Sequence, residues 1–124
     1  MALSEEQVAR IIEIAMDLAR QGQTDELLEF IDRGLAVDVQ DGEGNTLLML
    51  AAYHGHAETV QGLIDRGADV DLPNARNQAP IAGAIFKGED EIVALLRAAG
   101  ADLHAGTPSA LETAALFGRT DLLE

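Results

Sequence analysis

The chain has 124 residues, a formal net charge of −14 and no cysteine, so disulfides, thiolate metal sites and cysteine nucleophiles are excluded. Its 22 acidic residues against eight basic ones disfavour nucleic acids and anionic membranes as partners, because phosphate groups would be repelled. Apolar residues make up 48% of the chain but aromatic residues only 3%, which favours thin layers of aliphatic helices over a thick globule.

The first predicted element is a helix from residue 5 to about residue 21. Ser4 and Gln7 have the spacing of a capping box, which opens a helix. The buried stripe of this helix is expected to contain Val8, Ile11, Ile12, Ala15 and Leu18. The first residues carry acids where a signal peptide needs a basic region, and no apolar run reaches the roughly 20 residues of a membrane span. We therefore expect a cytoplasmic protein.

Two series of glycines recur along the chain at a spacing of about 33 residues. Each glycine follows a short apolar periodic stretch, as expected for a residue that ends a helix in the left-handed conformation. The two series are Gly22, Gly55, Gly88 and Gly118, and Gly34, Gly67 and Gly100. The sequence therefore predicts a repeat built from two short helices.

The predicted helices of the interior repeats are apolar on one side. In the second repeat the apolar residues are Leu47, Leu48, Leu50, Ala51 and Ala52, then Val60, Leu63 and Ile64. In the first repeat Phe30 falls on the apolar stripe of the second helix and is expected in the core. Gly62 and Gly83 fall inside helices, where each costs about 1 kcal/mol relative to Ala.

The stretch from Asp41 to Asp71 resembles an ankyrin repeat over its whole length, with D-x-x-G-x-T-x-L, A-A-x-x-G-H-x-E and G-A-D-V in order. Asn74 to Ala105 is similar to a second, weaker copy. The resemblance implies an all-α solenoid of stacked helix-turn-helix pairs with short β-hairpin-like fingers. Residues 5–40 would form an N-terminal capping repeat, 41–73 and 74–106 two repeats, and 107–124 a short C-terminal capping repeat.

The sequence departs from the ankyrin pattern at two places. The family's Thr-Pro-Leu-His tetrapeptide is replaced by residues 46–49, TLLM, and by residues 79–82, APIA, so its usual Thr and His hydrogen bonds cannot all form. The last finger is three residues shorter than the one before it, with Thr107 expected as the cap and Pro108 as the start of the next helix. The final helix stops at Glu124, which predicts a thin last layer that frays or self-associates.

No catalytic, cofactor or metal site is predicted. His54 and His56 are close in sequence, but His56 falls where the ankyrin pattern has a structural histidine. Ser4 and Ser109 fall near helix starts, without a histidine and an acid at the spacing of a catalytic triad. The sequence is therefore interpreted as that of a protein that is not an enzyme.

The resemblance implies that another protein binds to the concave face, which the first helices and the finger tips line. Transferred position by position, the candidates on helices are Arg20, Gln21, Tyr53, His54, Phe86, Lys87, Leu116 and Phe117. Those on fingers are Gly42, Glu43, Asn45, Ala75, Arg76 and Gln78. The identity of the partner cannot be read from these positions.

Two properties of this face are open to alternatives. Tyr53 and Phe86 are either exposed anchors for a partner or stack against each other to seal adjacent repeats. Three basic residues lie in the set beside one acid, Glu43, which predicts a neutral to mildly positive groove on an acidic body. The alternative function is that of a self-associating structural subunit that stacks through its thin C-terminal layer.

Overall fold

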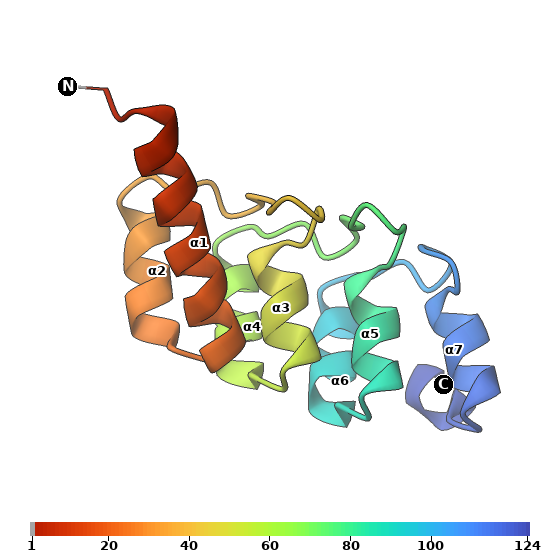
Figure 1. Cartoon of the computed structure of the whole chain (residues 1–124). Coiled ribbons are helices and arrows are strands. Elements are labelled where there is room, and N and C mark those ends of the chain that lie inside the picture. Colours follow the sequence, from red (N-terminus) through yellow and green to blue (C-terminus); the bar gives the residue numbers. More distant parts are fainter. Residues whose placement is uncertain (1) are drawn as a thin grey trace.

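The computed structural model describes residues 2–124, which form two rows of helices (Figure 1). One row contains α1 (Glu5–Gln21), α3 (Leu47–Tyr53), α5 (Pro80–Phe86) and α7 (Ala110–Leu116). Behind it lie α2 (Thr24–Asp32), α4 (Ala57–Asp65), α6 (Asp90–Ala98) and the 3-10 helix η1 (Thr120–Leu123). Each helix packs against its partner and against the next helix of its own row. The predicted all-α solenoid of helix pairs is confirmed.

The core lies between the two rows and repeats with the sequence. In the front row the fully buried residues Ala51, Ala84 and Ala114 occupy equivalent positions, four residues before the glycine that follows each helix. In the back row Leu27, Val60 and Val93 do the same. Phe30 is equivalent to the buried Leu63 and Leu96, yet it is only half-buried and lies outside the core cluster. The core prediction for Phe30 is wrong, because the first layer has a neighbour on one side only.

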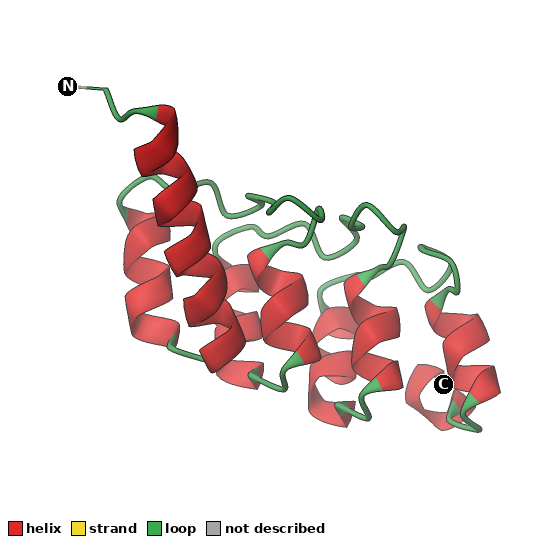
Figure 2. Cartoon of the chain, in the orientation of Figure 1, coloured by secondary structure: helices red, strands yellow, loops and turns green. Residues whose placement is uncertain are grey.

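The long helix α1 begins as predicted, at a capping box. The Ser4 hydroxyl accepts from the Gln7 amide at 3.1 Å, and the Gln7 side chain accepts from the Ser4 amide at 2.8 Å. The first turns of α1 extend past the end of α2 (Figure 2), so Val8 is exposed and its predicted burial is wrong. Met16 and Ala19, further along the helix, are buried instead.

The cap of α7 also differs from the prediction. The helix begins at Ala110, after Pro108, and its cap is Ser109, whose hydroxyl accepts from the Glu112 amide at 3.2 Å. The Glu112 carboxylate in turn accepts from the Ser109 amide at 3.0 Å. This reciprocal pair is the stronger capping arrangement. Thr107 does not cap; its hydroxyl accepts from the Asn77 side chain at 3.1 Å.

The fingers between helix pairs are turns more than hairpins. Within residues 2–124 the only bridge between extended segments joins Gln40 to Thr46. In the first finger the Asp41 carboxylate accepts from the amides of Glu43 and Asn45, both at 2.9 Å. Asn74 repeats this arrangement in the next finger, where its side-chain oxygen accepts from the amides of residues 76 and 78 at 3.0 Å. Side chains of Asp and Asn commonly build turns in this way.

Aspartates also join each connecting loop to the next one. The Asp38 carboxylate accepts from the Asp69 amide at 2.9 Å, and the Asp71 carboxylate accepts from the Asp102 amide at 2.8 Å. The next residue in this series of acceptors is His104. The two glycine series behave as predicted, since all seven glycines have positive φ, between 68° and 117°.

Candidate functional site

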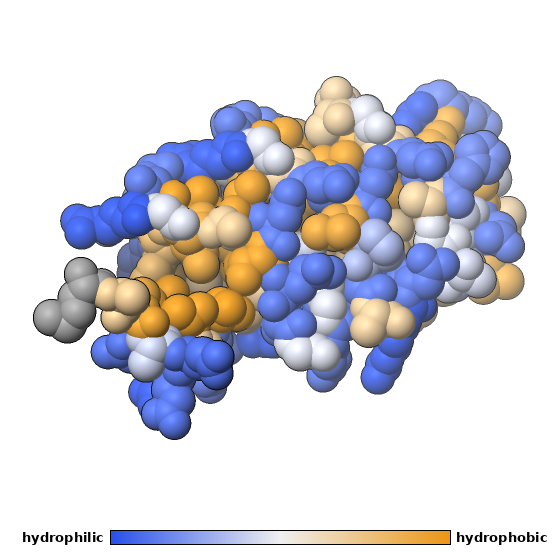
Figure 3. Space-filling model, turned by 90° about the horizontal axis from the view of Figure 1, so that it is seen from above, coloured by the Kyte–Doolittle hydropathy of each residue, from blue (hydrophilic) through white to orange (hydrophobic). Residues whose placement is uncertain are grey.

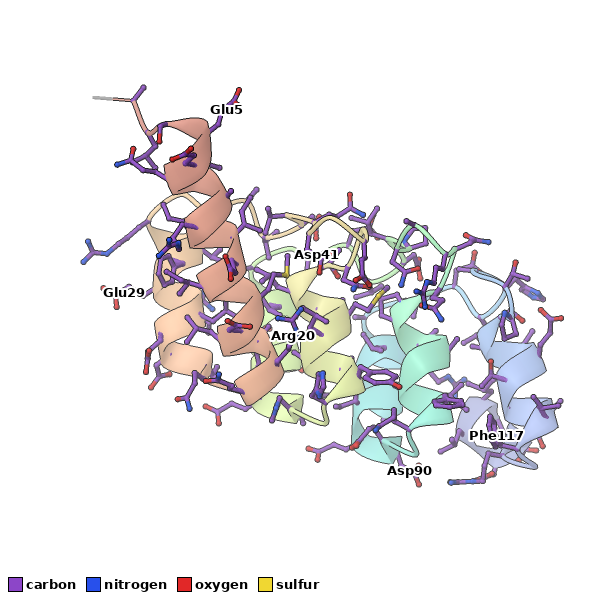
Figure 4. All side chains as sticks on the ribbon, viewed as in Figure 1. Glu5, Arg20, Glu29, Asp41, Asp90 and Phe117 are labelled. Atoms are coloured by element: carbon purple, nitrogen blue, oxygen red, sulfur yellow. The ribbon has the colours of Figure 1, made fainter. Side chains whose placement is uncertain are left out.

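Three of the four aromatic side chains lie at the C-terminal ends of successive front-row helices. Tyr53 ends α3, Phe86 ends α5 and Phe117 caps α7, and their exposed fractions are 39%, 57% and 48%. Figure 4 labels Phe117 on α7, in the same row as α3 and α5. Exposed aromatic side chains are the residues that most often dominate interface energies. Their alignment across three repeats therefore marks the strongest candidate site.

An apolar groove of about 430 Å³ lies between α3, α5 and α7. Its lining residues are Met49, Tyr53, Gln78, Ala79, Ala82, Gly83, Phe86, Pro108, Thr113, Leu116 and Phe117. We call it the aromatic groove. It brings together five of the predicted site residues, Tyr53, Gln78, Phe86, Leu116 and Phe117.

The aromatic side chains of the groove do not pair as one alternative expected. Phe86 packs edge-to-face against Phe117, with ring centroids 5.6 Å apart and planes at 78°. The ammonium of Lys87 instead lies 4.9 Å from the ring centroid of Tyr53, which is a cation–π contact. Tyr53 and Phe86 therefore do not stack to seal the repeats, and both keep an exposed ring face or edge.

A second hollow of about 320 Å³ lies beside α1 and the first finger. Its lining residues are Ala9, Ile12, Glu13, Met16, Arg20, Gln40, Asp41 and Gly42. We call it the N-terminal hollow. Of the predicted residues only Arg20 and Gly42 lie in it. Seen from above, apolar side chains gather toward this end of the stack (Figure 3).

The N-terminal hollow is not positive. The Arg20 guanidinium lies 2.8 Å from the Asp17 carboxylate and 3.9 Å from that of Asp41 (Figure 4). Glu13 lines the hollow as well. The predicted neutral to mildly positive groove is wrong for this half of the face, because its neighbouring acids come from α1 and from a finger that folds back on it.

The other predicted residues lie outside both hollows. On the fingers, Asn45 accepts from the Asn74 side chain at 3.0 Å, and the Ala75 amide donates to the Glu43 carbonyl at 2.9 Å. These contacts hold one finger against the next. Gln21, His54, Arg76 and Lys87 are exposed beside the hollows without lining them.

The two neighbouring histidines have different environments. Burial lowers the pKa of the His54 imidazole, and the positive charges of His56, Arg20 and Lys87 lower this pKa further. His54 is therefore neutral at pH 7. His56 is half-buried, and its Nε2 lies 2.7 Å from the Arg20 carbonyl oxygen, so it ties the end of α1 to the next repeat. Among residues 2–124 no three His, Asp or Glu side chains gather as metal ligands would.

Several residues of the groove were missed by sequence reasoning. Met49, Ala82 and Thr113 line it, and each precedes an aromatic residue of the groove by four positions in the sequence. Residues four apart lie on the same face of a helix. That spacing, counted back from Tyr53, Phe86 and Phe117, could have identified them. Pro108 carried no such signal, because the short last finger brings it to the groove.

None of the helices in residues 2–124 has the length and apolar composition that crossing a lipid bilayer requires. Residues 15–107 match the family described as ankyrin repeats in three copies. Over 43 residues the chain is 49% identical to an ankyrin repeat protein of Pseudomonas aeruginosa, and this match covers 35% of the chain and only 25% of the relative. Since the family pattern spans most of the chain and the helix pairs agree with it, the chain belongs to the ankyrin repeat family.

Proposed function

We propose that this chain binds another protein through the face formed by its fingers and front-row helices, with the aromatic groove as the centre of contact. Ankyrin repeats are in general protein–protein interaction modules. The proposal places no chemistry in the site, in keeping with a family that is typically not enzymatic. A cytoplasmic location is part of the same proposal.

The observation that carries the proposal is the row of exposed aromatic side chains over a preformed groove. The chain has only four aromatic residues, and three of them lie here. Aromatic side chains are enriched at the core of protein interfaces, where they contribute most of the binding energy. Because three of the chain's four aromatic side chains lie in one groove, this groove is favoured as the surface that recognises a partner.

The test compares two pairs of substitutions. Tyr53→Ala with Phe86→Ala removes the proposed anchors, while Leu3→Ala with Ile14→Ala removes side chains of similar exposure, 57% and 42%, that line neither hollow. Loss of an interface hot spot costs about 2 kcal/mol or more, which is roughly a thirtyfold loss of affinity. Partners captured from lysate of the native organism and quantified by mass spectrometry should be lost with the first pair only.

Equal recovery of the same partners by the wild type and by the Tyr53 and Phe86 variant would place the binding face elsewhere. Equal loss with both pairs would point to nonspecific apolar adsorption. Circular dichroism of each variant establishes that the fold is retained.

A second candidate is self-association through the C-terminal layer. One observation favours it: Leu116 is 79% exposed on α7, and Leu111 on the same helix is exposed as well. A second copy that covered both side chains would also occlude part of the aromatic groove, because Leu116 lines it. Sedimentation measurements separate this candidate from the first, because self-association raises the mass of the purified protein.

A further inference from the structure

Gly83 is a glycine in the interior of α5 that the fold does not require. Its φ is not positive, so no backbone conformation demands glycine. A Cβ atom added there would meet only the Tyr53 ring, at 3.6 Å, which is ordinary van der Waals contact. Glycine inside a helix costs about 1 kcal/mol relative to alanine. The chain therefore carries an unfavourable residue at Gly83 without a packing reason.

Gly62, the other glycine that the sequence places inside a helix, is explained by close packing. A Cβ atom on Gly62, in α4, would lie 2.7 Å from Cδ1 of Leu28, so glycine allows α2 to pack closely against α4. Gly83 has no such neighbour. It lies in the wall of the aromatic groove, where its missing side chain leaves the backbone of α5 open to a ligand. Glycine is the usual residue where another group approaches the backbone closely.

The charges beside the groove are the second observation. The chain has 22 acidic residues for its eight basic ones, so partners for cations are abundant. Arg20, Arg33, Arg66 and Arg119 each lie within 4.0 Å of a carboxylate. Arg10, Arg76, Lys87 and Arg97 do not, within residues 2–124, and of these Arg97 donates to the backbone oxygens of Leu122 and Glu124.

Two of these cations, Lys87 and Arg76, lie next to residues that line the groove. Lys87 follows Gly83 by one helical turn, and its amide donates to the Gly83 carbonyl at 3.0 Å. Its ammonium lies over Tyr53, a groove residue. Arg76 lies on the finger that continues to Gln78, another groove residue. Both cations are exposed and have no carboxylate partner among residues 2–124, so each is available to an acidic side chain of a bound segment.

We propose that the aromatic groove receives an acidic amphipathic segment of its protein partner, with a large apolar side chain seated over Gly83 and separate carboxylates contacting Lys87, at the C-terminal end of α5, and Arg76, on the finger before α5. This inference rests on the proposed function and specifies the chemistry of the partner. It runs against the charge of the whole chain, which at −14 favours basic partners. At the contact itself the nearby cations determine the electrostatic attraction, because charges more than about 8–10 Å away are largely screened at physiological salt.

The probe is a phage-displayed library of random 16-residue peptides, selected on the wild-type chain. We expect the enriched peptides to place Asp or Glu near Leu, Phe or Trp. Synthetic copies are then titrated by fluorescence anisotropy against wild type, Gly83→Ala, and Arg76→Ala with Lys87→Ala.

Gly83→Ala gives an unusual combination of expected results. Its melting temperature should rise, because alanine favours the helix and fits beside Tyr53. Its affinity for the peptides should fall by about fivefold or more, because the added methyl group fills the seat of the apolar side chain. The variant with Arg76→Ala and Lys87→Ala should bind the peptides more weakly, and its affinity for them should depend much less on salt concentration.

Enrichment of basic or uncharged peptides, undiminished binding by Gly83→Ala, or no enrichment at all would overturn the acidic partner. The outcomes that would reject the proposed function differ from those that would reject the acidic partner. Basic peptides that still need Tyr53 and Phe86 would leave the groove as the binding face and reject only its partner chemistry. Peptides of any charge that bind equally well without both rings would reject the groove itself.

Discussion

At the residue scale, single side chains join neighbouring repeats. Gly22 ends α1 with φ of 72°, and the His56 ring lies directly against it. A Cβ atom on Gly22 would overlap the ring atoms of His56, whose Nε2 is bonded to the Arg20 carbonyl oxygen. Glycine is thus needed at this position both for backbone conformation and for space.

We predict that Gly22→Ala is much more destabilising than Gly88→Ala. The two glycines have the same φ, 72°, but no atom lies within 4 Å of a Cβ added to Gly88. Gly88→Ala should lower the free energy of unfolding by about 1 to 2 kcal/mol, the cost of the left-handed conformation. Gly22→Ala should lose roughly 1 kcal/mol more, because His56 must move and its hydrogen bond is lost.

Urea denaturation of the two variants beside wild type measures this difference. A third variant, His56→Ala with Gly22→Ala, serves as the control, because it removes the ring that the methyl group would strike. Equal losses for the two single variants would mean that His56 moves aside without cost.

A residue of the site could be predicted from the sequence only where the residues around it are also close to it in the sequence. Tyr53, Phe86 and Phe117 could be assigned to one face because each lies just before a glycine that ends a helix. The pairing of Arg20 with Asp17, three positions earlier on α1, has a local spacing that could have been recognised in the sequence. Its contact with Asp41 could not be predicted, because Asp41 comes from a finger 21 positions later and reaches Arg20 only in the folded stack.

At the element scale, the C-terminal layer is short but tied to its neighbour. The Arg97 guanidinium, from α6, donates to the carbonyl oxygens of Leu122 and Glu124, both at 3.0 Å. Arg119 pairs with Asp90 of α6 at 2.9 Å, and its hydrogen bond to Asp121 lowers the pKa of that carboxyl. These contacts replace part of the packing that a full second helix would give.

We predict that the amide of Leu122 exchanges with solvent faster than that of Leu63. Leu63 is fully buried in an interior repeat, whereas Leu122 is half-buried in a 3-10 turn. Arg97→Ala should speed exchange at Leu122 further and leave Leu63 unchanged, since local opening of a terminal element does not require global unfolding. Hydrogen exchange followed by NMR measures both amides.

The matched control is Arg33→Ala, whose guanidinium pairs, within the described residues 2–124, only with Glu29 one helical turn earlier. It should leave Leu122 unaffected. Protection of Leu122 equal to that of Leu63 in a monomeric sample would contradict a weakly held last layer.

Helices were more predictable than the fingers for a physical reason. The ends of the helices are marked by signals that are local in the sequence, such as the Ser4 capping box and the glycine that follows α1. The conformation of a finger depends on contacts with the next finger, such as that between Asn45 and Asn74. The start of α7 was missed although its signal is local, since Thr107 and Ser109 are both acceptable caps but only Ser109 has Glu112 three positions later.

At the scale of the whole molecule, net charge and apolar surface oppose each other. A charge of −14 repels a second copy, while the exposed Leu111 and Leu116 would favour contact with one. The repulsion acts over about 10 Å at 0.1 M salt and only about 3 Å at 1 M. Ionic strength should therefore govern any self-association.

We predict a monomer of 13.1 kDa at low salt, with any rise in mass confined to high salt. Sedimentation equilibrium across protein concentrations at 0.05 M and 1 M salt gives the comparison. Leu116→Ser with Leu111→Ser should abolish a rise seen at 1 M. A constant monomer at both salt concentrations would remove self-association as a candidate function, and a dimer already at low salt would make it the leading one.

The aspartates that join the connecting loops give the stack a direction. Each layer offers a carboxylate that only the following layer uses, as Asp38 does for Asp69 and Asp71 for Asp102. His104 holds the next place in this series and has no carboxylate to offer. A connecting loop packed beyond the last one described, whether from this chain or from another copy, would have to join without the carboxylate that aligns the earlier loops.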